Sequence, residues 1–354
     1  MAHGIHIAVL ETDIPCQAVY AQRGLYSSQF RTLLQSAAKR INANTELQLQ
    51  NGPLAVHITA FDAVGGSLPP LECLRSTPRS PADSKAGSPF SPIDAILITG
   101  SASSAYDPHP WIRELESFIQ IVHTDFPLIK MFGSCFGHQI IAQALLSGSY
   151  TKDGAEADAH ATFHVEHSAL GFEFGIQAIT LEKSFTAHFP TLAQHTSPIS
   201  PFRIQLIHGD IVAPTPAAKA AALASGQGDI PLPPGWMNIG RSAACDIQGL
   251  YYPGRILTYQ GHFEFDVWSN RALCIEFGRR VNWPTELVER YIEQIERSLV
   301  PGAEDDDDAK RAAEVVLLFF AGEDNSGVVQ KPSGLGLGLG SLVAPNGMLT
   351  PPLE

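Results

Sequence analysis

A cysteine flanked by glycines is the residue of this sequence best placed for chemistry. It lies in residues 133–137 (GSCFG), between a short apolar run and a run with helical periodicity. Small neighbours permit the tight strand-to-helix turn that presents a nucleophile, and the start of a helix favours the thiolate of Cys135. The backbone N–H of Phe136 would then point toward a developing oxyanion. The alternative is a buried structural cysteine in a glycine-rich turn, but glycines directly after a strand favour a nucleophile.

A thiolate needs a partner that manages protons, and His262 and Glu264 are the candidates. They stand two positions apart in a strand-like run, residues 259–265 (YQGHFEF). In a strand, alternate side chains share one face, so Glu264 could orient the imidazole while His262 serves as base and acid. With Cys135 these residues form a Cys-His-Glu triad by role. The alternative is that His262 and Glu264 are unrelated polar residues on an exposed strand edge. The cysteine turn upstream makes this alternative less favoured.

Strand and helix patterns alternate through the first half of the chain and would position these residues. Apolar runs predict strands at residues 5–10, 56–61, 93–99 and 127–132. Apolar residues at helical spacing predict helices at residues 30–41, 111–122 and 140–146. This alternation predicts an α/β fold: a doubly wound, mostly parallel sheet with helices on both faces.

The second half is less regular and supports one main domain, residues 1–300. We expect further strands and helices at residues 172–181, 202–207, 246–251, 256–260, 285–299 and 310–320. Residues 65–92, rich in Pro, Ser and Gly, are expected to form a mobile surface loop, and residues 213–235 an insertion. Residues 301–354 are expected to hold an acidic linker (Glu304 to Asp308), a short helix and a disordered tail from about Gly322.

The hydrophobic content and the net charge exclude several classes of protein. The 354 residues are 44% hydrophobic, and 23 Lys+Arg against 36 Asp+Glu give a net charge of −13. A sizeable core is expected, and no basic excess exists to bind nucleic acid or an anionic membrane. The N-terminus lacks the basic region of a secretion signal, and no apolar stretch approaches the ~20 residues that span a bilayer. We therefore expect a soluble protein, located in the cytoplasm.

Neither a disulfide framework nor a metal site is expected. The 5 cysteines are odd in number and lack paired spacing. A histidine cluster, His160, His164 and His167 with Glu166, has no helical pattern and no thiol, so a metal is not favoured there.

The two motifs together resemble a known family. GSCFGHQ and YQGHFEF look like the class I, or triad-type, glutamine amidotransferase domain. Residues 96–107 (ILITGSASSAYD) are similar to that family's strand and oxyanion turn, usually GGPxS, and residues 208–212 to its HGDxV segment. The resemblance covers about residues 5–280, with the motifs in the family's order.

The resemblance implies a flavodoxin-like fold, a small γ-glutamyl substrate and no cofactor. Cys135 would be the nucleophile, His262 the base and Glu264 its orienting partner. Backbone N–H groups of an oxyanion and substrate pocket would come from Gly100, Ser101 and Phe136. Gln139 and Gly209 fall where the family contacts the glutamyl part of the substrate. The alternative for Gln139 is an amide on the helix surface, and the alternative for Gly209 is a plain turn glycine. His208 is interpreted as a scaffold residue of the wall of this pocket.

The sequence departs from the family pattern at two places. Ser101 and Ala102 replace the second Gly and the Pro of the oxyanion turn, and serine can present its backbone N–H there if its φ is negative. Phe263 stands where a Pro commonly separates the catalytic His and Glu. Both changes keep the triad and reshape the pocket, so glutamine itself is not established as the substrate.

Three functions remain open at this stage. A standalone γ-glutamyl hydrolase or peptidase fits a chain with no room for a synthetase domain. A glutaminase half would deliver ammonia to a separate synthetase partner. A non-catalytic binding module on the same fold is disfavoured by the intact Cys-His-Glu set. The physiological acceptor, the pathway and the oligomeric state are not encoded in these patterns.

Overall fold

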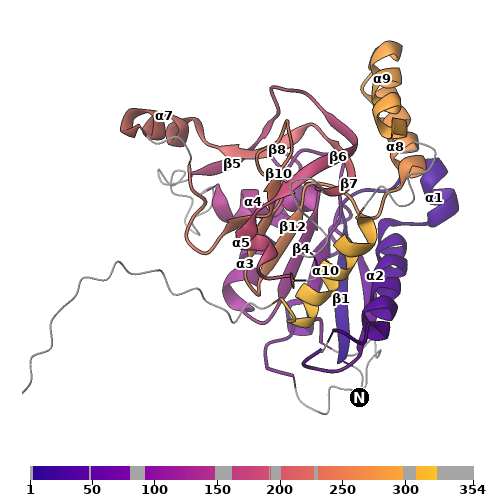
Figure 1. Ribbon diagram of the computed structural model, residues 1–354, viewed down its shortest axis with the longest axis vertical. Helices are drawn as coiled ribbons and strands as arrows, with labels where there is room; N and C mark the ends of the chain where they lie inside the picture. Colours follow the sequence, from indigo (N-terminus) through magenta and orange to yellow (C-terminus); the bar gives the residue numbers. More distant parts are fainter. Residues whose placement is uncertain are drawn as a thin grey trace, which may run out of the picture.

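The computed structural model describes residues 3–47, 49–79, 92–147, 162–190, 192, 201–226, 230–297 and 308–324 (Figure 1). Several predictions fall wholly or partly outside the described residues. They concern the loop at residues 80–91, His160, part of the insertion (227–229), most of the acidic linker (301–307) and the tail from residue 325.

A mixed sheet of seven strands forms the centre of the described part, in the order β2-β1-β3-β4-β12-β11-β9. The first five strands of this order are parallel, and β11 and β9 pair antiparallel at one edge. The strands are β1 His3–Glu11, β2 Leu54–Asp62, β3 Ala95–Ile98, β4 Lys130–Ser134, β9 Met237–Asn238, β11 Leu250–Tyr252 and β12 Ile256–Tyr259. The expected doubly wound, mostly parallel sheet is confirmed, with the parallel strands in the flavodoxin-like order 2-1-3-4-5.

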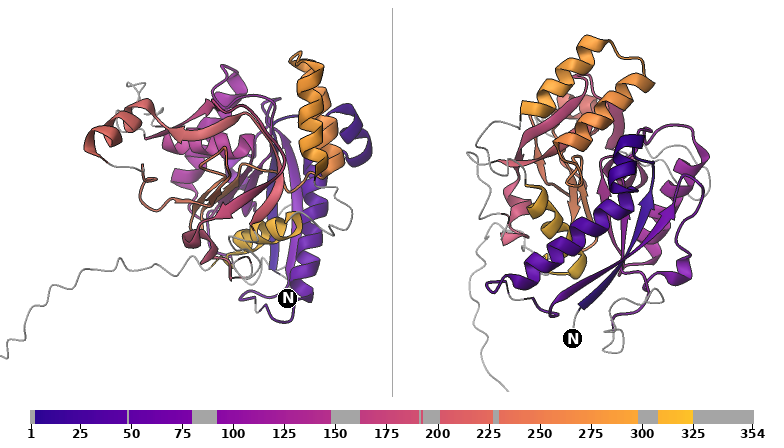
Figure 2. Two further views of the ribbon diagram at one scale, coloured as in Figure 1. Left: turned by 45° about the horizontal axis from the view of Figure 1, so that its top comes forward. Right: turned by 90° about the vertical axis from the view of Figure 1, so that its right-hand side faces the viewer.

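Helices cover both faces of this sheet, as alternation of buried side chains along each strand requires. Val9 of β1 packs in a core with α2 (Tyr26–Ala43) and α10 (Ala309–Ala321). Its neighbour Ala8 faces a second core built with α3 (Pro110–Asp125) and α4 (Phe136–Leu146). Figure 2 shows the two helix layers on either side of the strands.

The folded body extends further along the chain than the sequence patterns indicated. Residues 315–321 of α10 are all buried in the first core. Asp324, two residues beyond Gly322, is fully buried and accepts hydrogen bonds from the Tyr251 hydroxyl (2.8 Å) and the Gly254 N–H (3.1 Å). The last described residue is therefore tied to the central sheet through its carboxylate.

Smaller sheets and helices form a second layer beside the carboxyl ends of the parallel strands. A three-stranded antiparallel sheet has the order β10-β6-β7, and β5 pairs with β8. Their bounds are β5 Phe163–His167, β6 Glu173–Leu181, β7 Phe202–His208, β8 Asp210–Pro214 and β10 Gly240–Arg241. The remaining helices are α1 Gln17–Arg23, α5 Lys183–Thr186, α7 Pro216–Ser225, α8 Val267–Arg280 and α9 Thr285–Glu296, with a 3₁₀ turn at Leu71–Cys73. Of the described helices, none combines the length and the apolar content that crossing a bilayer demands.

Helix α8 is the main element that the sequence patterns missed. Its buried residues are the small or polar Ser269, Asn270, Cys274 and Gly278, so its buried face lacks a stripe of large apolar side chains. Asn270 donates hydrogen bonds to the Gln205 side chain (2.8 Å) and to the Leu206 carbonyl (3.0 Å), which ties α8 to β7. This packing matters for function because the far end of α8 reaches the candidate site.

Candidate active site

Cys135 sits in the tight turn that its glycine neighbours predicted. It joins β4 to α4 at φ 49°, a conformation that a residue with a side chain adopts only under constraint. Its N–H donates to the Tyr259 carbonyl at 2.8 Å. A Cβ on Gly133 would lie 2.3 Å from the backbone of Gly137, and one on Gly137 would lie 2.3 Å from the Ile98 carbonyl oxygen. Close backbone packing therefore requires glycine on both sides of the cysteine.

His262 and Glu264 lie next to each other, although the expected strand is absent. Strand β12 ends at Tyr259, and His262 follows in a loop held by one bridge, its N–H donating to the Gln205 carbonyl at 2.8 Å. The expectation of alternating strand geometry is therefore wrong here. The side chains meet all the same: His262 Nδ1 lies 2.7 Å from Glu264 Oε1, and both groups are buried.

Ser134, Phe265 and Gly100 form the surroundings of the His262–Glu264 pair. The Ser134 hydroxyl donates to Glu264 Oε1 at 3.2 Å, which fixes the carboxylate. The ring of Phe265 stacks on that of His262 with 4.2 Å between centroids and 13° between planes. A Cβ on Gly100 would lie 2.9 Å from His262 Cε1 and 3.7 Å from Cys135 Cβ, so the histidine and the cysteine border the same glycine.

The charge environment favours the protonated form of His262. Burial lowers the pKa of the imidazole, but the neighbouring Glu264 carboxylate and Cys135 outweigh burial and raise it well above 6.5. Nδ1 is taken by Glu264, and Nε2 is buried without a well-aligned hydrogen-bond partner among the described residues, although Cys135 is near enough to affect the ring. The arrangement can hold a proton on the imidazole beside the thiol.

These groups open into a cavity of about 240 Å³ at the carboxyl ends of the parallel strands. That edge of an open α/β sheet is where ligands bind. Of the residues expected to serve a substrate, the cavity wall includes Cys135, His262, Gly100, Ser101, Gln139 and Gly209. Phe136 is different: its ring is buried against Trp111 (5.5 Å between centroids), while its N–H belongs to the first residue of α4 and has no acceptor within the helix.

The turn that is predicted to hold the oxyanion places Ser101 in a backbone conformation open to any residue. Among the described residues, the non-glycine positions with positive φ are Cys135 and Asn282, so Ser101 has a negative φ. Its replacement of the family's second glycine therefore causes no left-handed strain.

Gln139 and Gly209 are built into the cavity wall. The Gln139 amide is buried and donates to the Asp210 carbonyl at 3.0 Å, which connects α4 to the start of β8. This excludes the alternative of a helix-surface amide. A Cβ on Gly209 would approach the Phe172 ring to 2.7 Å, so glycine is required here by side-chain packing rather than by a turn.

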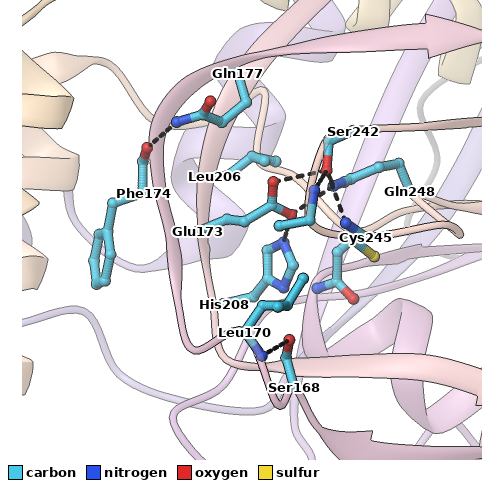
Figure 3. A network of polar contacts seen from close by, with 12 residues as sticks. Ser168, Leu170, Glu173, Phe174, Gln177, Leu206, His208, Ser242, Cys245 and Gln248 are labelled. Carbon is cyan, nitrogen blue, oxygen red and sulfur yellow. Dashed lines mark hydrogen bonds and ion pairs between the residues drawn. The ribbon is translucent and has the colours of Figure 1, made fainter.

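His208 lines the cavity and is part of a buried polar network. Its Nε2 lies 3.1 Å from Glu173 Oε2, and its Nδ1 lies 3.1 Å from the Asp210 carbonyl oxygen. Ser242 and Gln248 also donate to Glu173, at 2.7 and 2.9 Å (Figure 3). Burial raises the pKa of the Glu173 carboxyl, but these donors outweigh it and bring it below 4.5. The network anchors the β7–β8 corner that carries Gly209.

The histidine cluster near residue 164 divides between separate partners. His164 pairs with Glu166 (2.8 Å), whereas His167 lies 3.2 Å from Asp210 at the cavity. Within the described ranges, no group of three or more His, Cys, Asp and Glu side chains is arranged to hold a metal ion.

Comparison with known proteins found relatives that are named as glutamine amidotransferases or as glutamine amidotransferase-like proteins. No family profile matches the chain. A protein of Schizosaccharomyces pombe named as glutamine amidotransferase-like is 26% identical over 260 residues, covering 73% of this chain and 79% of the relative. A protein of Saccharomyces cerevisiae named as a glutamine amidotransferase is 29% identical over 175 residues, covering 48% of this chain and 53% of the relative.

The chain resembles glutamine amidotransferase-like proteins. The fold agrees: the crystal structure of a glutamine amidotransferase from Thermotoga maritima matches with a TM-score of 0.50 and 14% identity, covering 90% of this chain and 96% of that one. At this identity the match supports the fold.

Within this glutamine amidotransferase-like fold, sequence reasoning missed several residues of the site. Ser134 and Phe265 hold Glu264 and His262, and the Gln260 amide lies 3.7 Å from Cys135 Sγ. All three stand inside the two quoted motifs, so their proximity to the triad residues was a usable signal. Phe172 and Phe277 also border the cavity, but nothing in their sequence neighbourhood connects them to it.

Proposed function

We propose that this protein is a cysteine-dependent amidohydrolase or amidotransferase that acts on a γ-glutamyl amide through a γ-glutamyl thioester on Cys135. The main support is one observation: Cys135 and a Glu264-bound imidazole border the same glycine in a cavity at the carboxyl end of the sheet. Similarity to glutamine amidotransferase-like proteins supports the class of reaction.

In the proposed first step, the Cys135 thiolate attacks the γ-carbonyl carbon. Backbone N–H groups of Phe136 and of the Gly100–Ser101 turn stabilise the oxyanion. The carbon–nitrogen bond breaks as the imidazolium of His262 gives its proton to the departing nitrogen. Glu264 keeps the ring oriented and favours its charged form, in agreement with the raised pKa of His262.

In the second step, water or an acceptor amine attacks the thioester. His262 takes the proton of this nucleophile, and the sulfur leaves as the thiolate. With water, the products are glutamate and the free enzyme. Neither step requires a metal or an organic cofactor.

Release of glutamate by the purified chain tests the proposal. Glutamine, γ-glutamyl dipeptides and glutathione are offered, with the Cys135→Ala protein as the blank. We expect glutamate from the intact chain alone, and equal release by the variant would refute the cysteine mechanism.

The second candidate is a glutaminase subunit that supplies ammonia to a separate synthetase. It is retained because one of the curated relatives carries the glutamine amidotransferase name itself. Slow release from glutamine that accelerates with a partner protein identifies this case. Binding of γ-glutamyl compounds without turnover identifies the non-catalytic module.

A further inference from the structure

The outer half of the cavity differs in chemistry from its floor. Cys135, His262 and Gln139 at the floor are all buried. Toward solvent the wall passes to apolar and aromatic side chains that are half-buried or exposed: Ile14, Tyr106, Phe172, Leu273 and Phe277. A γ-glutamyl group attached to Cys135 would occupy the floor, so the leaving group would face these side chains.

The aromatic part of this outer wall is fixed in place. The Phe172 ring contacts those of Phe277 (5.7 Å between centroids) and Trp283 (4.9 Å), and Phe277 contacts Trp283 at 5.1 Å. Behind them, the ring centroids of Phe174 and Tyr291 lie 4.2 Å apart in the small core against which Phe172 and Trp283 pack. Because neighbouring rings hold Phe172 and Phe277, binding an apolar group there costs little side-chain entropy.

A positive charge lies at the edge of this aromatic wall. Arg280 and Glu276 both line the cavity, and Arg280 Nε donates to Glu276 Oε1 at 3.0 Å. Arg279 donates to the same carboxylate, at 2.8 and 2.9 Å. Two guanidinium groups share one carboxylate, so the end of α8 carries a net positive charge. Arg280 is the member of the pair that faces the cavity, where a leaving group with a carboxylate could reach it.

Two further carboxylates of the wall are occupied by donors of the protein. Asp13 accepts the N–H groups of Ile14 (2.7 Å) and Ala102 (2.8 Å). Asp210 accepts hydroxyl hydrogen bonds from Ser104 and Tyr106 at 2.5 and 3.1 Å, with His167 at 3.2 Å. These bonds reduce the attraction of either carboxylate for a cationic leaving group.

We propose, resting on the function proposed above, that the preferred substrate is a γ-glutamyl conjugate of an amino acid with a large apolar or aromatic side chain. The side chain would lie against Phe172 and Phe277, and the α-carboxylate of the leaving amino acid would pair with Arg280. Attack by Cys135 breaks the γ-glutamyl bond, and the released amino acid takes the proton of His262. Ammonia, the leaving group of glutamine, uses neither contact.

The first test compares leaving groups on the unaltered chain. The substrates are γ-glutamylphenylalanine, γ-glutamylglycine, γ-glutamyllysine, γ-glutamylphenethylamide and glutamine, with the released amine measured by chromatography. We expect kcat/KM for γ-glutamylphenylalanine to exceed that for γ-glutamylglycine by about tenfold or more. The phenethylamide keeps the ring and lacks the carboxylate, so its kcat/KM should fall about tenfold below that of γ-glutamylphenylalanine.

Variants assign each contact. Phe277→Ala should abolish the preference for phenylalanine over glycine, measured as the ratio of the two kcat/KM values, and Phe277→Leu should restore part of it. Arg280→Gln should raise KM for γ-glutamylphenylalanine about tenfold and leave the phenethylamide unaffected. Arg279→Gln is the matched control, because it removes a guanidinium from the same carboxylate outside the cavity wall.

The outcomes separate this inference from the reaction itself. Equal kcat/KM for phenylalanine, glycine and ammonia leaving groups overturns the inference and leaves the proposed reaction in place. Preference for γ-glutamyllysine also overturns it and assigns recognition to Asp13 and Asp210. Calorimetric binding to the Cys135→Ala protein gives a second readout that needs no turnover: tighter binding of γ-glutamylphenylalanine than of γ-glutamylglycine supports the inference, and equal binding contradicts it.

Discussion

The floor and the rim of the cavity are built in different ways. At the floor, Cys135, His262 and Gln139 are 6%, 3% and 3% exposed, whereas Ile14 and Tyr106 at the rim are 66% and 44% exposed. Cys135 and His262 follow strands β4 and β12 of the parallel sheet, and their backbone N–H groups donate to the carbonyls of Tyr259 and Gln205. Rim residues come from loops and from α8, outside the sheet. We infer that the parallel sheet positions the residues that carry out the reaction, and that α8 and the loops determine which substrate is cleaved.

The largest effect should come from the floor. Cys135→Ala should abolish glutamate release, and Cys135→Ser should leave only a trace, because a serine alkoxide forms far less readily than a thiolate. Circular dichroism and thermal unfolding should show an intact fold. The control Cys73→Ala changes an exposed cysteine outside the cavity and should retain activity. Residual turnover in Cys135→Ala would show that the reaction does not depend on Cys135, so the floor could not be assigned the chemistry.

Glu264→Gln should reduce kcat/KM by about 10²- to 10⁴-fold and change its pH dependence. The Glu264 carboxylate raises the pKa of His262, so its removal lowers that pKa. The imidazolium is then lost at a lower pH, and the alkaline limb of the kcat/KM profile should move downward in pH. A profile that keeps its alkaline limb in place would show that Glu264 does not control the protonation of His262.

Gly100→Ala tests how closely the floor is packed. The new methyl group would lie 2.9 Å from His262 Cε1, so we expect the imidazole to shift and turnover to fall by about tenfold to a hundredfold. The neighbouring Ser101→Ala keeps the backbone N–H and adds no atoms, so it should remain near full activity. Comparable kcat/KM for both variants would mean that the floor tolerates movement of the histidine.

A rim variant should leave the thiol unchanged. In Phe277→Ala, alkylation of Cys135 by iodoacetamide should stay within about twofold of the unaltered rate, since no charge near the thiol changes. In Glu264→Gln the same reaction should change clearly. The measurement is the rate of labelling at Cys135 by mass spectrometry, and a large change in Phe277→Ala would show that rim and floor are coupled.

Asp324→Ala should affect stability and leave turnover at the floor unchanged. It removes the carboxylate that accepts from the buried Tyr251 hydroxyl and the Gly254 N–H, which should cost about 1–3 kcal/mol in the free energy of unfolding. Denaturant titration measures this loss, with Glu323→Ala as a neighbouring control. Unfolding at the same midpoint as the unaltered chain would show that the contact is dispensable.

Sequence reasoning predicted the floor far better than the rim. Neighbours close in the chain determine the turn at Cys135 and the pairing of His262 with Glu264. Such local patterns can be recognised from the sequence. The strand proposed for His262 was wrong because a tertiary contact to Gln205, rather than alternation, sets the direction of this loop.

The rim depends on contacts between distant segments. Phe172 and Phe277 are brought together by packing around Trp283. The buried face of helix α8 lacks a stripe of large apolar side chains, so hydrophobic periodicity gave no signal for it. Residues whose position depends on such packing cannot be placed from spacing along the chain.

Helix α10 has a consequence for the synthesis of the protein. It packs against α2, β1 and β4, so the first strand and the last described helix share one core. A growing chain cannot complete that core until residues 309–324 have left the ribosome, long after β1 has emerged. Until then the apolar face that α10 covers is exposed. Cys135 directly follows β4, so one strand beside it gains its full packing only after residues 309–324 have emerged.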